Sequence, residues 1–201
     1  MNSVTNGGRT SAELVLALGD SLTAGYRLRP EQSFASRLEV RLQERRPGSR
    51  VINAGVSGDT SAGGLARLPR LLDRQTRRPD LCLVELGAND AIRAIDPATT
   101  QANLEQILAE LSRRGVPALL AGVVAPAFLG SYAIRFNAVF ADVAARHGVP
   151  LYPSFLAGVA GRPGLVQADG LHPNAAAVDL VAASILPHVE AALPPLRDLA
   201  A

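Results

Sequence analysis

Two short segments near opposite ends of the chain carry side chains suited to covalent chemistry. A Gly-Asp-Ser-Leu turn at residues 19–22 follows an apolar run, and the segment 169–172 places Asp169 and His172 three residues apart. A serine nucleophile needs a neutral base, and the base needs a third group that fixes its tautomer. Asp169 and His172 can supply those two groups to Ser21 from a single turn. The alternatives are that Ser21 only caps a helix and that His172 only stands exposed in a turn.

Two more polar positions follow the next apolar runs. Gly58 lies in the sequence Val-Ser-Gly-Asp, and Asn89 lies in Gly-Ala-Asn-Asp. A tetrahedral intermediate of acyl transfer needs preorganised donors aimed at its oxyanion, and the Gly58 N–H and the Asn89 side-chain amide suit that role. The simpler explanations are a positive φ at Gly58 and a turn in which the Asn89 amide binds its own backbone. The nearby Asp20 and Asp90 are expected to brace their loops through backbone hydrogen bonds rather than to act as acid or base.

Short apolar runs alternate with stretches of helical periodicity along the whole chain, which is the βαβ pattern. Buried parallel strands are expected at residues 14–18, 50–54, 81–85, 118–123 and 151–152. Helices are expected at residues 32–45, 61–74 and 131–147, and around 104–111 and 178–185. The prediction is one three-layer α/β/α domain over 1–201, with a five-stranded parallel sheet in the flavodoxin-like order 2-1-3-4-5 and a flexible N-terminus at 1–12. All four polar segments then meet at the carboxyl ends of the strands, which favours their catalytic interpretation over the simpler ones.

Composition excludes several other chemistries. All 20 basic residues are arginine, so no lysine can form a Schiff base or serve a phosphate loop. The single cysteine, Cys82, allows no internal disulfide, and with three histidines it makes no cysteine-rich zinc site, so neither metal nor cofactor is expected. The net charge is only +2 and the arginines are scattered, which indicates solvated helix surfaces rather than a nucleic-acid site.

The location is predicted from the N-terminus and from hydropathy. Residues 1–13 lack an apolar segment after a basic start, so a cytoplasmic protein is expected, or a periplasmic or secreted one if the chain is a trimmed mature form. The most apolar stretch, residues 116–130, contains two prolines and is shorter than the ~18 residues that a membrane span needs. Stable membrane insertion is therefore not expected.

In order and spacing, the polar segments resemble the four blocks of the SGNH or GDSL family of lipases and esterases. Stretches at 57–61, 64–69 and 84–87 look like the bacterial branch of acyl-CoA thioesterase I/lysophospholipase L1 enzymes and arylesterases. This resemblance covers nearly the whole chain. It implies that Ser21 is the nucleophile, His172 the base and Asp169 the orienting carboxylate. It also implies an oxyanion hole made of the Ser21 N–H, the Gly58 N–H and the Asn89 amide.

The expected function is hydrolysis of carboxylic esters through an acyl-enzyme on Ser21. Short-chain and aryl esters are the first candidates, with acyl thioesters and lysophospholipids as further ones, and the partner is a small-molecule ester. One alternative is a carbohydrate O-acetyl esterase of the same family. Another is a non-catalytic flavodoxin-like module that holds a phosphate or nucleotide, although neither GxGxxG nor GxxxxGK[ST] is present. The sequence leaves the oligomeric state open.

Overall fold

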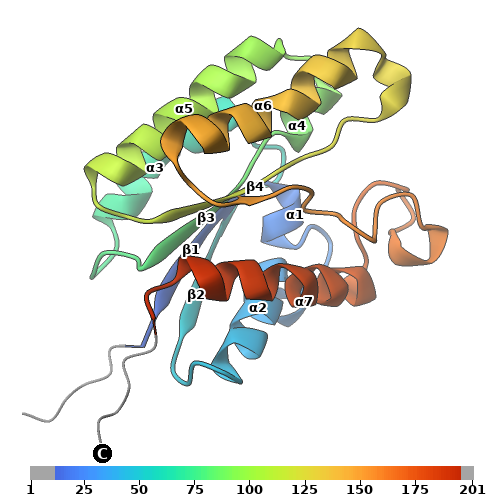
Figure 1. Ribbon diagram of the computed structural model, residues 1–201. Coiled ribbons are helices and arrows are strands. Elements are labelled where there is room, and N and C mark those ends of the chain that lie inside the picture. The colour runs from blue at the N-terminus through green and yellow to red at the C-terminus, as the bar shows by residue number, and fades with distance from the viewer. Residues whose placement is uncertain (1–11, 196–201) are drawn as a thin grey trace, which may run out of the picture.

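A computed structural model describes residues 12–195. The flexible segment expected at residues 1–12 lies outside the described residues apart from Ala12. Five parallel strands form one sheet in the order β2-β1-β3-β4-β5 (Figure 1), which confirms the predicted order. The strands are β1 (Leu14–Gly19), β2 (Arg50–Gly55), β3 (Leu81–Glu85), β4 (Ala118–Ala121) and β5 (Leu151–Tyr152).

Helices cover both faces of the sheet, so the molecule has three layers (Figure 1). One face packs against α2 (Phe34–Gln43) and α7 (Ala175–Ala192). The other face packs against α3 (Ser61–Asp73), α5 (Pro97–Arg113) and α6 (Ser131–His147). Shorter helices lie in the connections: α1 (Ser21–Ala24), η1 (Pro30–Gln32), α4 (Ala88–Ile92), η2 (Ala127–Leu129) and η3 (Pro163–Leu165).

Strand β1 is apolar throughout because both of its faces are buried. In β1, Val15 and Ala17 point toward α2 and α7, whereas Leu16 and Leu18 point toward α3, α5 and α6. All four are at most 1% exposed. A strand covered on both faces has no solvated side, and its side chains therefore show no alternation of polar and apolar residues.

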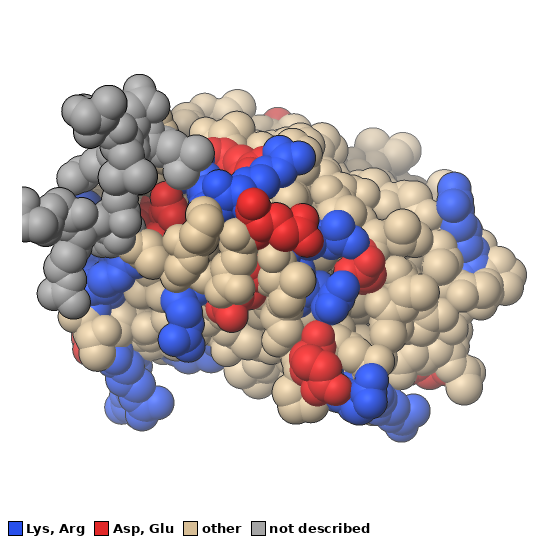
Figure 2. Space-filling model, turned by 90° about the horizontal axis from the view of Figure 1, so that it is seen from below, with Lys and Arg blue, Asp and Glu red and all other residues tan. Residues whose placement is uncertain are grey.

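Helix α7 is the one helix within residues 12–195 that is long and apolar enough to cross a membrane by length and composition. Seven of its residues are buried among the residues of the sheet and of α2. Its outer side carries Asp179, which accepts from Arg37 and Arg41 of α2. Figure 2 shows acidic and basic side chains interleaved on this face. The apolar composition of α7 is therefore that of a core helix.

Several boundaries differ from the sequence prediction by one or two residues, and two of these differences have a clear local cause. The strand expected at 118–123 ends at Ala121, because its neighbour β5 has only two residues. The Gly122 N–H still donates to the Tyr152 carbonyl, and the Phe155 N–H donates to the Gly122 carbonyl, but no partner strand continues beyond them. The helix expected at 32–45 begins at Phe34, because the Ser33 hydroxyl caps it.

Gly55, the last residue of β2, gives a test of the packing beneath the turn after β1. A Cβ at this position would lie 2.3 Å from the Ala24 nitrogen and 2.8 Å from the Asp20 oxygen, both of them backbone atoms. Gly55→Ala is expected to lower the free energy of unfolding by about 1–3 kcal/mol in urea titrations, because backbone cannot move aside as a side chain can. In the control Gly164→Ala the added methyl meets no atom within 4 Å. An equal loss of stability in both variants would contradict this packing.

Candidate active site

The turn after β1 presents Ser21. The Asp20 carboxylate accepts a 2.9 Å hydrogen bond from the Leu22 N–H and caps α1, so Ser21 is the first helical residue. The interpretation of Ser21 as the helix cap is therefore wrong. Gly19 permits the sharp turn, since a Cβ there would lie 2.0 Å from the Thr23 hydroxyl oxygen. The nucleophile candidate thus sits on a short, tightly packed helical turn at the end of β1.

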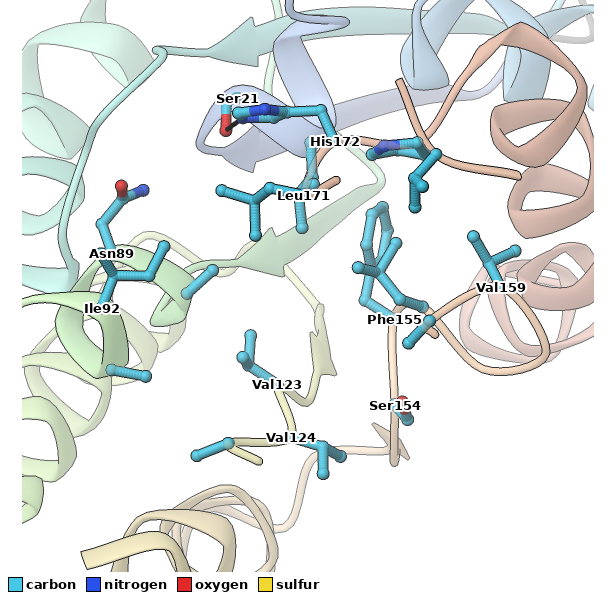
Figure 3. A pocket seen from close by; sticks show the side chains of 18 of the residues that line it. Ser21, Asn89, Ile92, Val123, Val124, Ser154, Phe155, Val159, Leu171 and His172 are labelled. Carbon is cyan, nitrogen blue, oxygen red and sulfur yellow. Dashed lines mark hydrogen bonds between the residues drawn. The ribbon is translucent and has the colours of Figure 1, made fainter. Parts of the chain in front are cut away.

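The structure brings Ser21, His172 and Asp169 into one hydrogen-bonded row. His172 Nε2 lies 3.0 Å from Ser21 Oγ, although 151 residues separate them in the sequence (Figure 3). His172 Nδ1 lies 2.8 Å from Asp169 Oδ2. The second oxygen of Asp169 accepts from the backbone N–H groups of His172 and Leu171, both at 3.0 Å. These bonds, first that from the His172 N–H, hold the pKa of Asp169 well below its usual range, so it is ionised wherever a neutral histidine can act as base.

The residues of the proposed oxyanion donors, Ser21, Gly58 and Asn89, line the same cavity. Within the described residues, neither the Ser21 N–H nor the Gly58 N–H donates to a protein acceptor, and both residues line the cavity beside the serine. Gly58 has a φ of 85°, so the simpler explanation of this glycine, a backbone with positive φ, is correct as well. The Asn89 amide binds the Asp20 carboxylate at 3.0 Å and the Asp59 carbonyl at 2.8 Å rather than its own backbone. Both of its hydrogens are therefore engaged near the site.

Asp90 braces the segment that carries Asn89, as expected from the sequence. It is fully buried, and it accepts from both the N–H and the hydroxyl of Ser61 and from the hydroxyl of Thr100. These bonds join α4 to the first turns of α3 and α5. The neighbouring loop is held by Arg93, whose guanidinium donates to the Gly58 carbonyl at 2.8 Å. The sequence analysis did not identify this contact of Arg93.

A second buried carboxyl group, that of Glu85, lies beneath the serine turn. The sequence analysis did not identify it either. It is fully buried at the end of β3, and its Oε2 accepts from the Thr23 hydroxyl at 2.8 Å. Burial, together with the charge of Asp20, raises the pKa of Glu85 well above its ordinary value. Burial also raises the pKa of Asp20 to about 6. The signal in the sequence was an acidic residue at the end of an otherwise apolar strand.

A cavity of about 580 Å³ opens beside Ser21 and His172. No Asp, Glu or Arg side chain of residues 12–195 lines it, and most of its wall is aliphatic (Figure 3). The large apolar side chains that line it are Leu22, Ile92, Val123, Val124, Phe155, Leu156, Val159, Val166 and Leu171. No three His, Cys, Asp or Glu side chains of the described chain are grouped so as to hold a metal ion. The site can therefore place an apolar group of a substrate against the serine–histidine pair.

The raised pKa of Asp20 predicts a pH-dependent contribution to stability. A carboxyl group whose pKa rises on folding, here from 3.8 to about 6, favours the folded state at low pH and loses that contribution as the pH rises through about 6. Relative to wild type, Asp20→Asn should gain roughly 2 kcal/mol of unfolding free energy between pH 4.5 and 8. Urea unfolding at both pH values measures this. The control is Asp96→Asn, which alters an exposed cap of α5, and a parallel gain in that variant would refute the assignment to Asp20.

The chain is similar to known proteins over most of its length. The sequence model of the GDSL-like Lipase/Acylhydrolase family matches residues 17–180. Esterase TesA of Pseudomonas aeruginosa is 42% identical over 170 residues, which are 84% of each chain, and an arylesterase of Vibrio mimicus is 38% identical over 89% of this chain and 91% of its own. The crystal structure of AlinE4, an SGNH-hydrolase family esterase, is 43% identical over 91% of this chain and 97% of its own, with a TM-score of 0.77. The matched segment contains every candidate site residue, and the chain belongs to the GDSL, or SGNH, family of lipases and acylhydrolases.

Proposed function

We propose that this protein is a serine esterase that hydrolyses carboxylic esters through an acyl-enzyme on Ser21. The observation that carries the proposal is the row Ser21 Oγ, His172 Nε2, His172 Nδ1 and Asp169 Oδ2, with spacings of 3.0 and 2.8 Å, at the edge of an apolar cavity. Membership of a family whose members include an esterase and an arylesterase supports it.

The geometry suits a two-step acyl transfer. In the first step Ser21 Oγ attacks the ester carbonyl while His172 Nε2 takes the hydroxyl proton, and the ionised Asp169 stabilises the imidazolium that forms. The tetrahedral intermediate collapses as His172 returns the proton to the leaving alkoxide, which departs as the alcohol. Water then repeats the sequence on the acyl-enzyme, which releases the acid and restores Ser21.

In this mechanism the oxyanion of each intermediate accepts from three donors whose residues line the cavity, Ser21, Gly58 and Asn89. The Ser21 and Gly58 N–H groups have no protein acceptor within residues 12–195, so both are available to it. The Asn89 amide already binds Asp20 and Asp59. It acts as the third donor by sharing one of its hydrogens with the oxyanion. Donors fixed before the reaction need no reorganisation when the charge develops.

The cavity favours an acyl or aryl group over a sugar. Its volume is in the range of pockets for small organic ligands. Besides Ser21 and His172, the polar side chains in its wall are those of Tyr26, Ser57, Asn89 and Ser154. A sugar ring would leave several hydroxyl groups against aliphatic surface, which costs free energy. The absence of a cation from the described lining likewise disfavours a module that binds phosphate or nucleotides.

Covalent labelling tests the function directly. Wild type should hydrolyse p-nitrophenyl esters and take up one equivalent of an uncharged serine-directed organophosphonate, seen as a single mass shift of the intact protein. Ser21→Ala and His172→Ala should lose both properties, because the nucleophile or its base is missing. The matched controls are Ser154→Ala, in the same cavity, and His147→Ala, at the end of α6. Folded wild type without esterase activity, or a label that survives Ser21→Ala, would overturn the proposal.

The role of Asn89 can be tested separately. If its amide stabilises the oxyanion, Asn89→Ala should lower kcat by roughly 10²–10³, which corresponds to about 3–4 kcal/mol of transition-state stabilisation. The comparison is Asn103→Ala, which also removes an amide that donates to a side chain, the Ser61 hydroxyl, but does not line the cavity. A kcat for Asn89→Ala within a few-fold of the Asn103→Ala value would show that Asn89 only supports the loop.

A further inference from the structure

The loop that carries His172 has few polar attachments to the part of the molecule that carries Ser21. Residues 156–174 lie between β5 and α7 and contain the short helix η3. Within the described chain, only two hydrogen bonds join this loop to residues 12–60. One is the bond between His172 and Ser21 itself. The other comes from Gln167.

The Gln167 side chain donates in two directions at once. Its Nε2 lies 2.9 Å from the Tyr26 carbonyl oxygen and 3.0 Å from the Pro173 carbonyl oxygen. A primary amide has two hydrogens, so these two bonds use its full donor capacity. The Gln167 backbone N–H also donates to the His172 carbonyl at 2.8 Å. Gln167 therefore holds both His172 and the residue after it.

Tyr26 continues this connection to the nucleophile. Its N–H donates to the Ser21 carbonyl at 3.1 Å. Its ring packs against the His172 imidazole, with 4.5 Å between centroids and an angle of 39° between planes. A continuous path of hydrogen bonds thus runs from the Ser21 carbonyl through Tyr26 to Gln167. From Gln167 it reaches the carbonyl groups of His172 and Pro173.

We propose that Gln167 is a positioning residue that sets the distance between Ser21 Oγ and His172 Nε2. This inference rests on the proposed function, in which that distance governs proton transfer. Gln167 does not line the cavity and takes no proton, so its effect reaches the reaction only through the placement of His172. Misplacement of a reacting group by about 1 Å can cost as much as 10²-fold in rate.

Part of the substrate-binding surface lies outside the loop that this bridge holds. The aliphatic wall formed by Ile92, Val123 and Val124 belongs to other segments of the chain and makes no hydrogen bond with Gln167 within the described residues. The loop also contributes Val159, Val166 and Leu171 to the cavity wall, so loss of the bridge should lower kcat by a much larger factor than it changes KM. Loss of a residue that merely stabilised the whole fold would not lower kcat selectively while KM stayed nearly the same.

The test uses two substitutions that remove the donors but keep the length of the side chain. Gln167→Met replaces the amide with a thioether, and Gln167→Glu turns acceptor oxygens toward two carbonyl oxygens. Each should lower kcat for p-nitrophenyl butyrate 10- to 100-fold with KM within twofold, and should slow organophosphonate labelling of Ser21 by a similar factor. The control is Gln106→Ala on α5, whose amide donates only to the Ala102 carbonyl of its own helix.

The outcomes separate this inference from the proposed function. Each variant is assayed below its own thermal unfolding midpoint, and if Gln167→Met fails to fold, Gln167→Glu decides the question. A kcat within twofold of wild type, or a fall in activity that appears only as a raised KM, overturns the role of Gln167 while the esterase proposal stands. Absence of hydrolysis and labelling in folded wild type and in Gln106→Ala overturns the proposed function itself.

Discussion

The candidate active site depends on one contact, the 3.0 Å hydrogen bond between Ser21 Oγ and His172 Nε2. The two residues lie 151 positions apart, so neither local conformation nor helix propensity can bring them together. Ser21 is fixed by β1, an inner strand of the sheet, and His172 by a loop whose following residues enter α7. A parallel sheet makes this meeting possible, because the carboxyl ends of its strands and the segments that follow them all lie at one edge.

Polar groups beneath the serine turn give that edge its rigidity. Glu85 and Asp20 are both fully buried, and together they accept from the Thr23 hydroxyl, the Leu22 N–H and the Asn89 amide. Burial raises the pKa of both carboxyl groups, so these bonds come at a cost in stability at neutral pH. A chain selected only for stability would place apolar groups here. The retained acids hold Ser21 and Asn89 in fixed relative positions.

Much of the fold follows from periodicity alone. Most strands are short and mainly apolar, and the helices carry a single apolar stripe, so their identity was predictable, and right-handed crossovers then gave the strand order. The end of β4 was not predictable, because it depends on the two-residue length of its neighbour β5. Periodicity also left open whether Ser21 caps α1, and the structure gives that role to Asp20, because both side chains can cap a helix and only their orientation decides between them.

The sequence by itself determined which residues are available for chemistry. With no lysine and one buried cysteine, Ser21, His172, Asp169, Gly58 and Asn89 remained, and their positions after apolar runs assigned them to one edge of the sheet. Tertiary structure alone decided the bonds that these residues form. The Asn89 amide binds Asp20 and Asp59, Glu85 lies buried under the serine turn, and Gln167 bridges two distant loops. These contacts depend on the packing of segments far apart in sequence, and periodicity reports which side of an element is buried but not which side chain it meets there.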